Sequence, residues 1–283
     1  MRRKSGAKWA AALGLAAVAA GAAGGFAPPG RAPAPRSAAS DAVRAGAAPG
    51  TAPVPQAGAG PHRAFVFTRG IYSDGRGFRR GFRRGSWSVD YPKADEQFLT
   101  VLRRLVAIDA HDGENAVRLD DPGLRRYPFL YMLEVGYMQM TPEEVKGLRE
   151  YLLAGGFLMV DDFWGTAEWY NFEMEIQRVL PEYPIVEVPL DHPLFHSVYN
   201  VDEVVQVPNV SNARWGEQTW ERDGFVPHVR GIFDEKGRLL VAINWNTDLG
   251  DAWEWAEQPY YPVNYSTYAF QVGVNTIIYA MSH

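Results

Sequence analysis

Short apolar runs alternate with amphipathic segments along residues 63–190. In the amphipathic segments the apolar residues recur with the period of one helix face, whereas the runs between them have the length of buried strands. Strands that alternate with helices predict an α/β fold, a three-layer sandwich around a mostly parallel sheet. The predicted strands are 63–70, 115–119, 127–134, 157–160 and 184–188, and the predicted helices are 91–107, 141–156 and 167–180.

The segment 141–156 has the clearest helix boundaries. Thr141 is placed as the N-cap, and Glu144 stands where a capping box needs an acidic side chain. At the other end Gly155 or Gly156 predicts the C-cap, because glycine readily adopts the left-handed backbone that ends many helices.

The pattern changes after residue 191, where the predicted strands become shorter. The stretch 231–245, "GIFDEKGRLLVAINW", predicts a hairpin that turns at 235–237. The stretch "STYAFQVGVNTIIYAM" predicts a closing amphipathic helix that is capped by Ser266. We therefore expect one folded domain over residues 63–283.

The N-terminal segment predicts export. A basic start and a run of small apolar residues resemble a signal peptide over 1–22 that is cleaved before Ala23, and an uncleaved anchor is the alternative. Residues 23–62 are rich in alanine, proline and glycine, so they predict a disordered tether. We expect the mature protein to be periplasmic or extracellular, without a transmembrane span.

Composition removes several classes of function. The formal net charge of −5 argues against nucleic acid as a partner, because nucleic-acid binders usually carry a basic excess over a whole domain. The chain contains no cysteine, which excludes disulfides, thiolate metal ligands and a cysteine nucleophile. No cofactor is predicted.

The stretch "GGFLMVDDFWG" places two aspartates, Asp161 and Asp162, at the end of a predicted buried strand. Ligands of α/β sheets bind at the carboxyl ends of strands, which favours a site for a sugar hydroxyl, a basic partner or a hard cation. The alternative is that the carboxylates cap the helix that begins near Thr166 or accept hydrogen bonds from loop amides. We expect the two to differ, one in a local cap and one facing a cleft.

Three stretches together resemble the bacterial domain of unknown function 4159 (DUF4159) family. They are "YSDGRGFRRGFRRGSWSVDYPKAD", "YPFLYMLEVGYMQMTPEEVKGLREYLLAGGFLMVDDFWG" and "LDHPLFHSVYNVDEV", and the resemblance covers the chain after the tether. More remotely, "DHPLFHSVYNVDE" and "GRLLVAINWN" are similar to the trehalose-utilisation branch of the class I glutamine amidotransferase-like fold. That similarity implies a flavodoxin-like sheet.

The amidotransferase resemblance implies a nucleophilic cysteine just after the strand that here ends at Val160. This chain has Asp161 and Asp162 in that region, so the thiol mechanism is excluded. A serine elbow is also missing, because Phe163 and Trp164 stand where a nucleophile turn needs small residues. An aspartate nucleophile is the alternative that stays open.

The motif "DHPLFH" supplies Asp191, His192 and His196, which together with Asp161 would give an oxygen and nitrogen ligand set for a divalent metal. The alternative is that the histidines make only structural hydrogen bonds, because Pro193 prevents a helix that would place them on one face.

Two other groups are candidates for ligand contacts. The loop "GRGFRRGFRRGSW", which contains Arg79 and Arg83, suits an anionic surface polymer or an acidic protein patch, with a solvated loop as the alternative. Aromatic residues in predicted loops either stack on sugars or pack in the core. They are Trp215, Trp220, Trp253, Trp255, Tyr260 and Tyr261.

Two functions follow from these patterns. The favoured one is an exported protein whose amidotransferase-like domain lacks the catalytic cysteine and binds a small molecule, a glycan or a protein at the strand ends. The alternative is a metal-assisted hydrolase of a glycan, with Asp161 or Asp162 as base or metal ligand and His192 as proton carrier. The candidate ligand-binding residues are Asp161, Asp162, Asp191, His192, Glu134, Trp164, Arg79 and Arg83. The favoured function predicts no bound metal, and the residues that a metal would use in the alternative are Asp161, His192 and His196.

Overall fold

The computed structural model describes residues 64–74, 85–111, 113, 115–216 and 218–283. Within them seven strands form one sheet in the order β2-β1-β3-β4-β7-β6-β5. Neighbouring strands from β2 to β7 are parallel, whereas β6 runs antiparallel to both β7 and β5. The strands are β1 Arg69–Ile71, β2 Ala116–Arg118, β3 Phe129–Leu133, β4 Phe157–Asp161, β5 Ile185–Glu187, β6 His228–Phe233 and β7 Leu239–Trp245.

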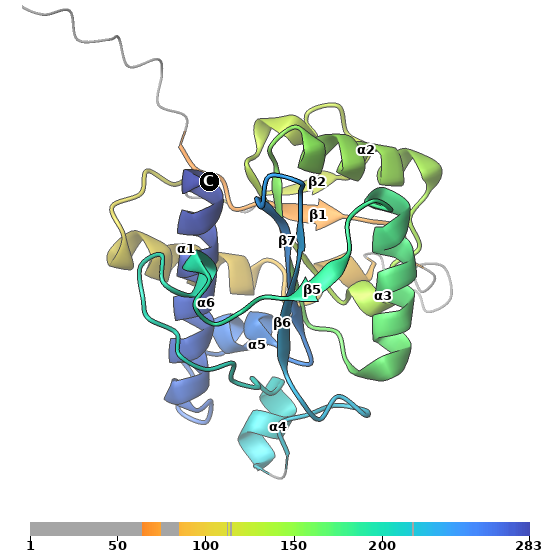
Figure 1. Ribbon diagram of the computed structural model, residues 1–283. Coiled ribbons are helices and arrows are strands. Elements are labelled where there is room, and N and C mark those ends of the chain that lie inside the picture. Colours follow the sequence, from red (N-terminus) through yellow and green to blue (C-terminus); the bar gives the residue numbers. More distant parts are fainter. Residues whose placement is uncertain (1–63, 75–84, 112, 114, 217) are drawn as a thin grey trace, which may run out of the picture. The chain divides into compact units, whose positions relative to one another are not determined.

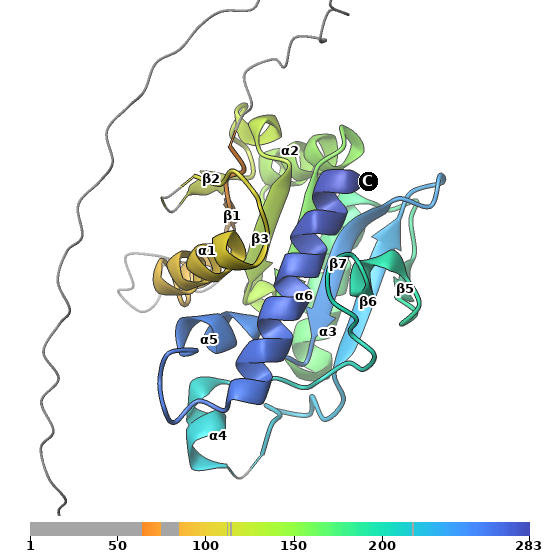
Figure 2. The ribbon, with the colours of Figure 1, turned by 90° about the vertical axis from the view of Figure 1, so that its left-hand side faces the viewer.

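Helices cover both faces of this sheet (Figures 1 and 2). On one face lie α2 and α3, and on the other lie α1, α5 and α6. The expected mixed α/β fold with a mostly parallel sheet is confirmed, and the helices on its two faces make three layers. The helices are α1 Lys93–Leu105, α2 Pro142–Leu153, α3 Gly165–Val179, α4 Val210–Trp215, α5 Leu249–Glu254 and α6 Val263–Ser282.

The central strand β3 separates two hydrophobic cores. All five of its residues are buried. Phe129, Tyr131 and Leu133 pack toward α1, α5 and α6, whereas Leu130 and Met132 pack toward α2 and α3. A continuous apolar run is what a strand covered on both faces requires, and the sequence predicts this element correctly.

The predicted boundaries of α2 agree closely with the structure. Glu144 N donates to Thr141 Oγ1 at 3.2 Å, and Thr141 N donates to Glu144 Oε2 at 3.0 Å, so the capping box is confirmed. The C-cap is Ala154 rather than a glycine. Gly155 follows it with a φ of +108°, the left-handed backbone expected just beyond a helix end.

The closing helix α6 begins earlier than predicted. Its first residue is Val263, and Ser266 is buried inside the first turn instead of capping it. The carbonyl of Pro262 already accepts hydrogen bonds from Tyr265 N and Ser266 N, so the helix has started before the serine is reached. No described helix, α6 included, is long and apolar enough to cross a bilayer.

Two predicted strand segments also differ in how well they match. In the sheet β1 covers only Arg69–Ile71 of the strand predicted at 63–70, and Phe65 forms only an isolated bridge to Ala110. The predicted hairpin is confirmed, because β6 and β7 pair antiparallel around a turn in which Gly237 has a φ of +79°.

The parallel strands give the sheet two distinct edges. The carboxyl edge is where β1, β3, β4 and β7 end, and the amino edge is where β4 and β7 begin and the β6–β7 hairpin turns. Ligand sites of open α/β sheets occur at the carboxyl edge.

Candidate functional site

An acidic cleft of about 170 Å³ lies at the carboxyl edge. Its lining comes from the chain after β3, β4 and β7, from the residues before α1, and from the segments on either side of α4. Among the described lining residues seven are carboxylic acids and only Arg222 is basic. The acids are Asp90, Glu134, Asp162, Glu168, Glu221, Asp248 and Asp251, and the other lining residues are Val89, Trp164 and Asn209.

Unusual backbone conformations are concentrated at this cleft. The described non-glycine residues with positive φ are Asp90, Glu134, Asp162, Arg222 and Asn246, with φ between +49° and +61°. Four of them line the cleft. The fifth, Asn246, accepts a hydrogen bond from Gly165 N, next to the lining residue Trp164. Aspartate and asparagine adopt this conformation at low cost, but glutamate and arginine do so less often. Such residues cluster at functional sites.

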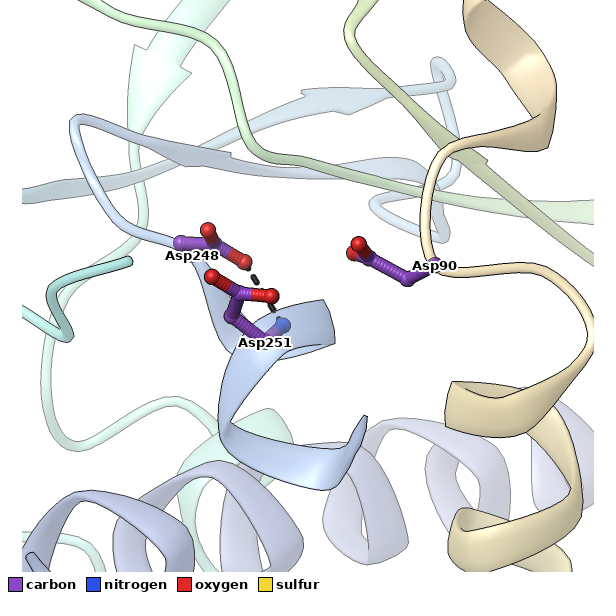
Figure 3. Close-up of side chains that lie close together, drawn as sticks. All are labelled: Asp90, Asp248 and Asp251. Atoms are coloured by element: carbon purple, nitrogen blue, oxygen red, sulfur yellow. Dashed lines mark hydrogen bonds between the residues drawn. The ribbon is translucent and has the colours of Figure 1, made fainter. Parts of the chain in front are cut away.

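Asp90, Asp248 and Asp251 form the tightest acidic group in the cleft (Figure 3). One carboxylate oxygen of each lies within 4.8 Å of those of the other two. Asp248 is the N-cap of α5 and accepts a hydrogen bond from Asp251 N at 2.7 Å, while Asp90 faces this pair from the loop before α1. Asp90 Oδ2 is enclosed but accepts no hydrogen bond within the described part of the chain. Such an oxygen requires a proton or a cation nearby.

Fixed contacts hold these carboxylates in place. Asp251 Oδ1 accepts a hydrogen bond from Trp255 Nε1 at 3.1 Å. The buried Arg69 donates to the carbonyl of Val89 at 2.7 Å, which fixes the backbone immediately before Asp90. The arrangement is therefore set before any ligand arrives, which lowers the entropic cost of binding.

Burial and mutual repulsion raise the pKa of the cleft carboxyl groups. Burial raises the pKa of Asp90 well above its usual value, and the charge of Asp251 raises it further. Burial also raises the pKa of Asp162 well above normal, with repulsion from Glu134 as the next cause. The pKa of Asp248 is raised well above normal by burial and then by Asp162, and burial raises that of Asp251. Groups of this kind take up protons more readily than ordinary carboxylates, and a bound cation would displace those protons.

Asp161 and Asp162 have different surroundings. Asp161 is fully buried, and its Oδ2 accepts hydrogen bonds from Leu249 N at 2.9 Å, Gly250 N at 3.0 Å and the Tyr131 hydroxyl at 2.8 Å. Burial raises the pKa of Asp161 to about 7, although these hydrogen bonds oppose the rise. Asp162 instead lines the cleft and accepts a hydrogen bond from a nearby indole. One aspartate is thus a cap for α5, and the other faces the cleft.

The helix that begins near Thr166 is capped by other residues. Gly165 N donates to Asn246 Oδ1 at 2.8 Å, and Thr166 N donates to Asp223 Oδ1 at 3.0 Å. The aspartate pair therefore does not cap this helix, but Asp161 does accept hydrogen bonds from backbone amides, the other part of that alternative. Side chains alternate along β4, so Asp161 points to the face that carries α5 and not to the face that carries α3.

The segment between α4 and β6 brings a guanidinium to the cleft. Arg222 Nη2 lies 2.6 Å from Glu168 Oε1 and also contacts the Tyr137 hydroxyl. The neighbouring Asp223 accepts hydrogen bonds from Thr166 and so fixes this segment to the start of α3. The described lining of the cleft therefore includes one cationic side chain that is fixed in place.

One family model matches most of the chain. This model, Domain of unknown function (DUF4159), matches residues 78–281, which include all the described residues that line the cleft. The chain belongs to the DUF4159 family. The family expected from the sequence is thereby confirmed. No curated protein matches the sequence.

The DUF4159 domain brings together three of the predicted ligand-binding residues. Glu134, Asp162 and Trp164 all line the cleft. They follow β3 and β4, neighbouring parallel strands, so their side chains meet at the carboxyl edge. Asp161 lies beneath them in the protein interior.

The structure does not bring the candidate metal ligands Asp161, His192 and His196 together. The ring of His192 packs against Phe233 and Tyr279 at the amino edge, with centroid separations of 5.5 and 5.4 Å. The reason is that the chain after β5 turns toward the amino edge, where the short 3-10 helix Pro193–Phe195 packs against α6.

The two histidines have the structural role that was the alternative. His192 Nδ1 accepts a hydrogen bond from Leu194 N at 3.1 Å. Both ring nitrogens of His196 are also used, with Nε2 2.7 Å from Leu190 O and Nδ1 3.2 Å from the side chain of Asn200. Asp191 is exposed beside them, away from the cleft.

The remaining candidates have mixed outcomes. Arg79 and Arg83 lie outside the described residues. Trp253 and Tyr261 are buried in the core, so for these two the core-packing alternative holds. Trp215 is highly exposed, whereas Trp220, Trp255 and Tyr260 are half-buried.

Sequence reasoning missed several residues of the cleft. Asp248 and Asp251 could have been found, because "NTDLGD" follows the strand that ends at Trp245, as "DD" follows β4. Asp90 and Arg222 carry no comparable sequence signal. They reach the cleft only through loops whose course depends on the tertiary fold.

Proposed function

We propose that the cleft binds a divalent cation, with Ca²⁺ as the best fit, through Asp90, Asp248 and Asp251. The enclosed, unpartnered Oδ2 of Asp90 beside two other carboxylates is the observation that carries this proposal. Carboxylate oxygens are the ligands of hard cations, and Ca²⁺ tolerates an irregular set drawn from separate loops. The volume of about 170 Å³ leaves room for water or ligand hydroxyls on the ion.

In this proposal the protein is an exported binding module. The order of the parallel strands β2, β1, β3, β4 and β7 is that of flavodoxin-like sheets, and this supports an amidotransferase-like domain. The place of the nucleophilic cysteine is taken by Asp161, a structural cap, and by Asp162 in the cleft. A ligand held at the carboxyl edge by a cation fits this geometry better than acyl transfer does.

A metal-assisted hydrolase is the second candidate. Its support is the raised pKa of Asp162 in the same cleft as the proposed cation site, because a raised pKa favours the protonated form that a general acid needs. His192 drops out of this mechanism, since it lies at the amino edge. Water on the bound cation would be the nucleophile.

Isothermal titration calorimetry of the chelator-treated protein with Ca²⁺, Mn²⁺ and Mg²⁺ tests the cation site. We expect one Ca²⁺ per chain, with protons released on binding because the cation displaces them from the carboxyl groups. Asp248→Asn should weaken binding by about tenfold or more, since it removes a charged ligand. His192→Asn is the matched control and should retain the affinity. Equal affinity in the wild type and Asp248→Asn would sink the proposal.

Export is tested separately. N-terminal sequencing of the protein recovered outside the cytoplasm should give a chain that begins near Ala23. Recovery of the chain from the cytoplasm with Met1 intact would contradict export, whatever the outcome of the calcium titration.

A further inference from the structure

A row of aromatic side chains leads from the acidic cleft across the protein surface. We call Arg214, Trp215 and Tyr260 the aromatic rim. The Arg214 guanidinium lies over the rings of Trp215 and Tyr260, at 5.0 and 4.9 Å from their centroids. Tyr260 is 6.3 Å from Trp255, whose indole donates to Asp251 in the cleft. The rim and the cation cluster are therefore connected through one tryptophan.

The inner residue of the rim, Tyr260, packs against the core, whereas the outer residue, Trp215, is exposed. Trp215 is 71% exposed, while Tyr260 and Trp255 are half-buried against the core. The helix α4 that carries Trp215 is fixed at its start, where Asn209 caps it and also lines the cleft. Rings that are already ordered stack on a ligand at a low entropic cost.

Arg214 gives the rim a positive charge without a counter-ion. Within the described part of the chain Arg214 makes no hydrogen bond or ion pair, and its partners are the two rings alone. A guanidinium that retains free N–H donors beside aromatic rings can bind a carboxylate through paired hydrogen bonds. The protein carries a net charge of −5, so a cationic spot with open donors is a selective feature of this surface.

We propose that the aromatic rim binds an acidic glycan, a chain that contains uronic acid units. One sugar ring would stack on the exposed ring of Trp215, and its carboxylate would pair with Arg214. The chain would continue past Trp255 toward the cleft. Binding at the rim stands without the cation, and only the continuation into the cleft rests on the proposed function.

Calorimetry and tryptophan fluorescence of the full chain with a short oligogalacturonate test the rim, and the cello-oligosaccharide of the same length is the neutral counterpart. In chelator we expect oligogalacturonate to bind at least about tenfold more tightly than the neutral sugar. Arg214→Gln and Trp215→Ala should each weaken it by about tenfold or more. Both residues are exposed, so thermal unfolding should be unchanged. Tyr170→Ala, which removes a 63% exposed aromatic ring on α3, is the control and should retain affinity.

Three results would overturn the rim: no binding of oligogalacturonate by the wild type, equal binding of the neutral sugar, or full affinity in Trp215→Ala. The cation site is judged separately by adding Ca²⁺. If Ca²⁺ tightens wild-type binding but not that of Asp248→Asn, the continuation into the cleft is supported. If Ca²⁺ changes neither, the continuation fails while the rim remains.

Discussion

Two aspartates at opposite edges of the sheet, Asp234 and Asp90, have pKa values that are shifted in opposite directions. At the amino edge Asp234 accepts hydrogen bonds from Lys236 N and Arg238 N at 2.9 Å each, and these amides outweigh burial and lower its pKa. At the carboxyl edge Asp90 keeps an enclosed oxygen without a donor in the described chain, and burial and repulsion raise its pKa. The residue type is the same, but its surroundings reverse the sign of the effect.

This contrast separates structure from function. An aspartate whose surroundings lower its pKa stabilises the fold in its charged form, as Asp234 does in the hairpin turn. An aspartate whose pKa is raised costs stability when it is charged, and natural proteins retain such groups where a ligand needs them. The carboxyl edge therefore has a carboxylate, that of Asp90, which a ligand could stabilise, whereas Asp234 at the amino edge is already stabilised by the protein.

The largest expected effect comes from the ion pair between Arg69 and Asp95, in which both side chains are fully buried. Arg69 donates to Asp95 Oδ1 from both Nε and Nη2, at 2.9 and 2.7 Å, and to Val89 O beside Asp90. Arg69→Met should lower the free energy of unfolding by about 3–5 kcal/mol, because it removes the cation that balances the buried Asp95 carboxylate. Urea denaturation measures this loss.

A second substitution separates stability from positioning. Asp95→Leu added to Arg69→Met should recover most of the stability, since the buried carboxylate is removed together with its cation. Calcium affinity should be lower than that of the wild type in both variants, because neither has Arg69 to fix the backbone before Asp90. On the amino edge Arg238→Met should cost only about 1–2 kcal/mol. Normal calcium affinity in the double variant would refute the positioning role of Arg69.

The next effect is a pair of substitutions with opposite signs. Asp248→Asn should stabilise the cation-free protein at pH 7 by about 1–2 kcal/mol, because burial and then repulsion by neighbouring carboxylates raise the pKa of Asp248, and a neutral amide avoids both costs. The matched Asp234→Asn should destabilise by about 1 kcal/mol, since it weakens charge-assisted hydrogen bonds. Chemical denaturation in chelator decides. Destabilisation by both changes would mean that the two edges do not differ.

Acidification should distinguish the edges without any mutation. Asp161, with a pKa of about 7, and Asp90, Asp162 and Asp248 gain protons in the folded state before the unfolded state does. The folded state then binds more protons, so the melting temperature in chelator should rise as the pH falls from about 8 to about 5. Below about pH 4 it should fall, because carboxylates with lowered pKa such as Asp234 become protonated.

Calcium provides the control for this pH series. The cation keeps the cleft carboxylates ionised, so saturating Ca²⁺ should stabilise the protein most near neutral pH and flatten the rise on acidification. A cation-free melting temperature that falls steadily from pH 8 to about pH 5 would show that the cleft carboxyl groups are not under repulsion.

The fold was predictable where local rules and tertiary packing agree. The run "YPFLYMLE" predicts β3 because both of its faces are buried, and Thr141 with Glu144 predicts α2 because a capping box needs only local residues. The start of α6 was missed because a proline and a serine compete for it within a few residues. Local signals do not rank such competitors.

The site residues that the sequence predicted correctly are those that follow β3 and β4, two strands that are consecutive in the chain. Glu134, Asp162 and Trp164 follow adjacent parallel strands, so the strand-end rule finds them. Asp90 and Arg222 come from loops, and no periodicity reports where a loop returns. The motif "DHPLFH" misled for the same reason, because its ligand-like residue types are satisfied by hydrogen bonds close in sequence.

The smallest expected effect is at His192 on the amino edge. Burial lowers the pKa of His192, with the charge of His283 as a further cause and Asp191 opposing them. The unfolded state therefore takes up this proton first, so the histidine contributes stability above about pH 6.5 that is lost as the pH falls through its lower folded pKa. This loss opposes the gain at the carboxyl edge. His192→Asn keeps an acceptor for Leu194 N and removes the titration, so the rise in melting temperature between pH 7 and pH 5 should become slightly steeper while calcium affinity stays the same. A shallower rise in the variant would place the pH response in the histidine and not in the cleft.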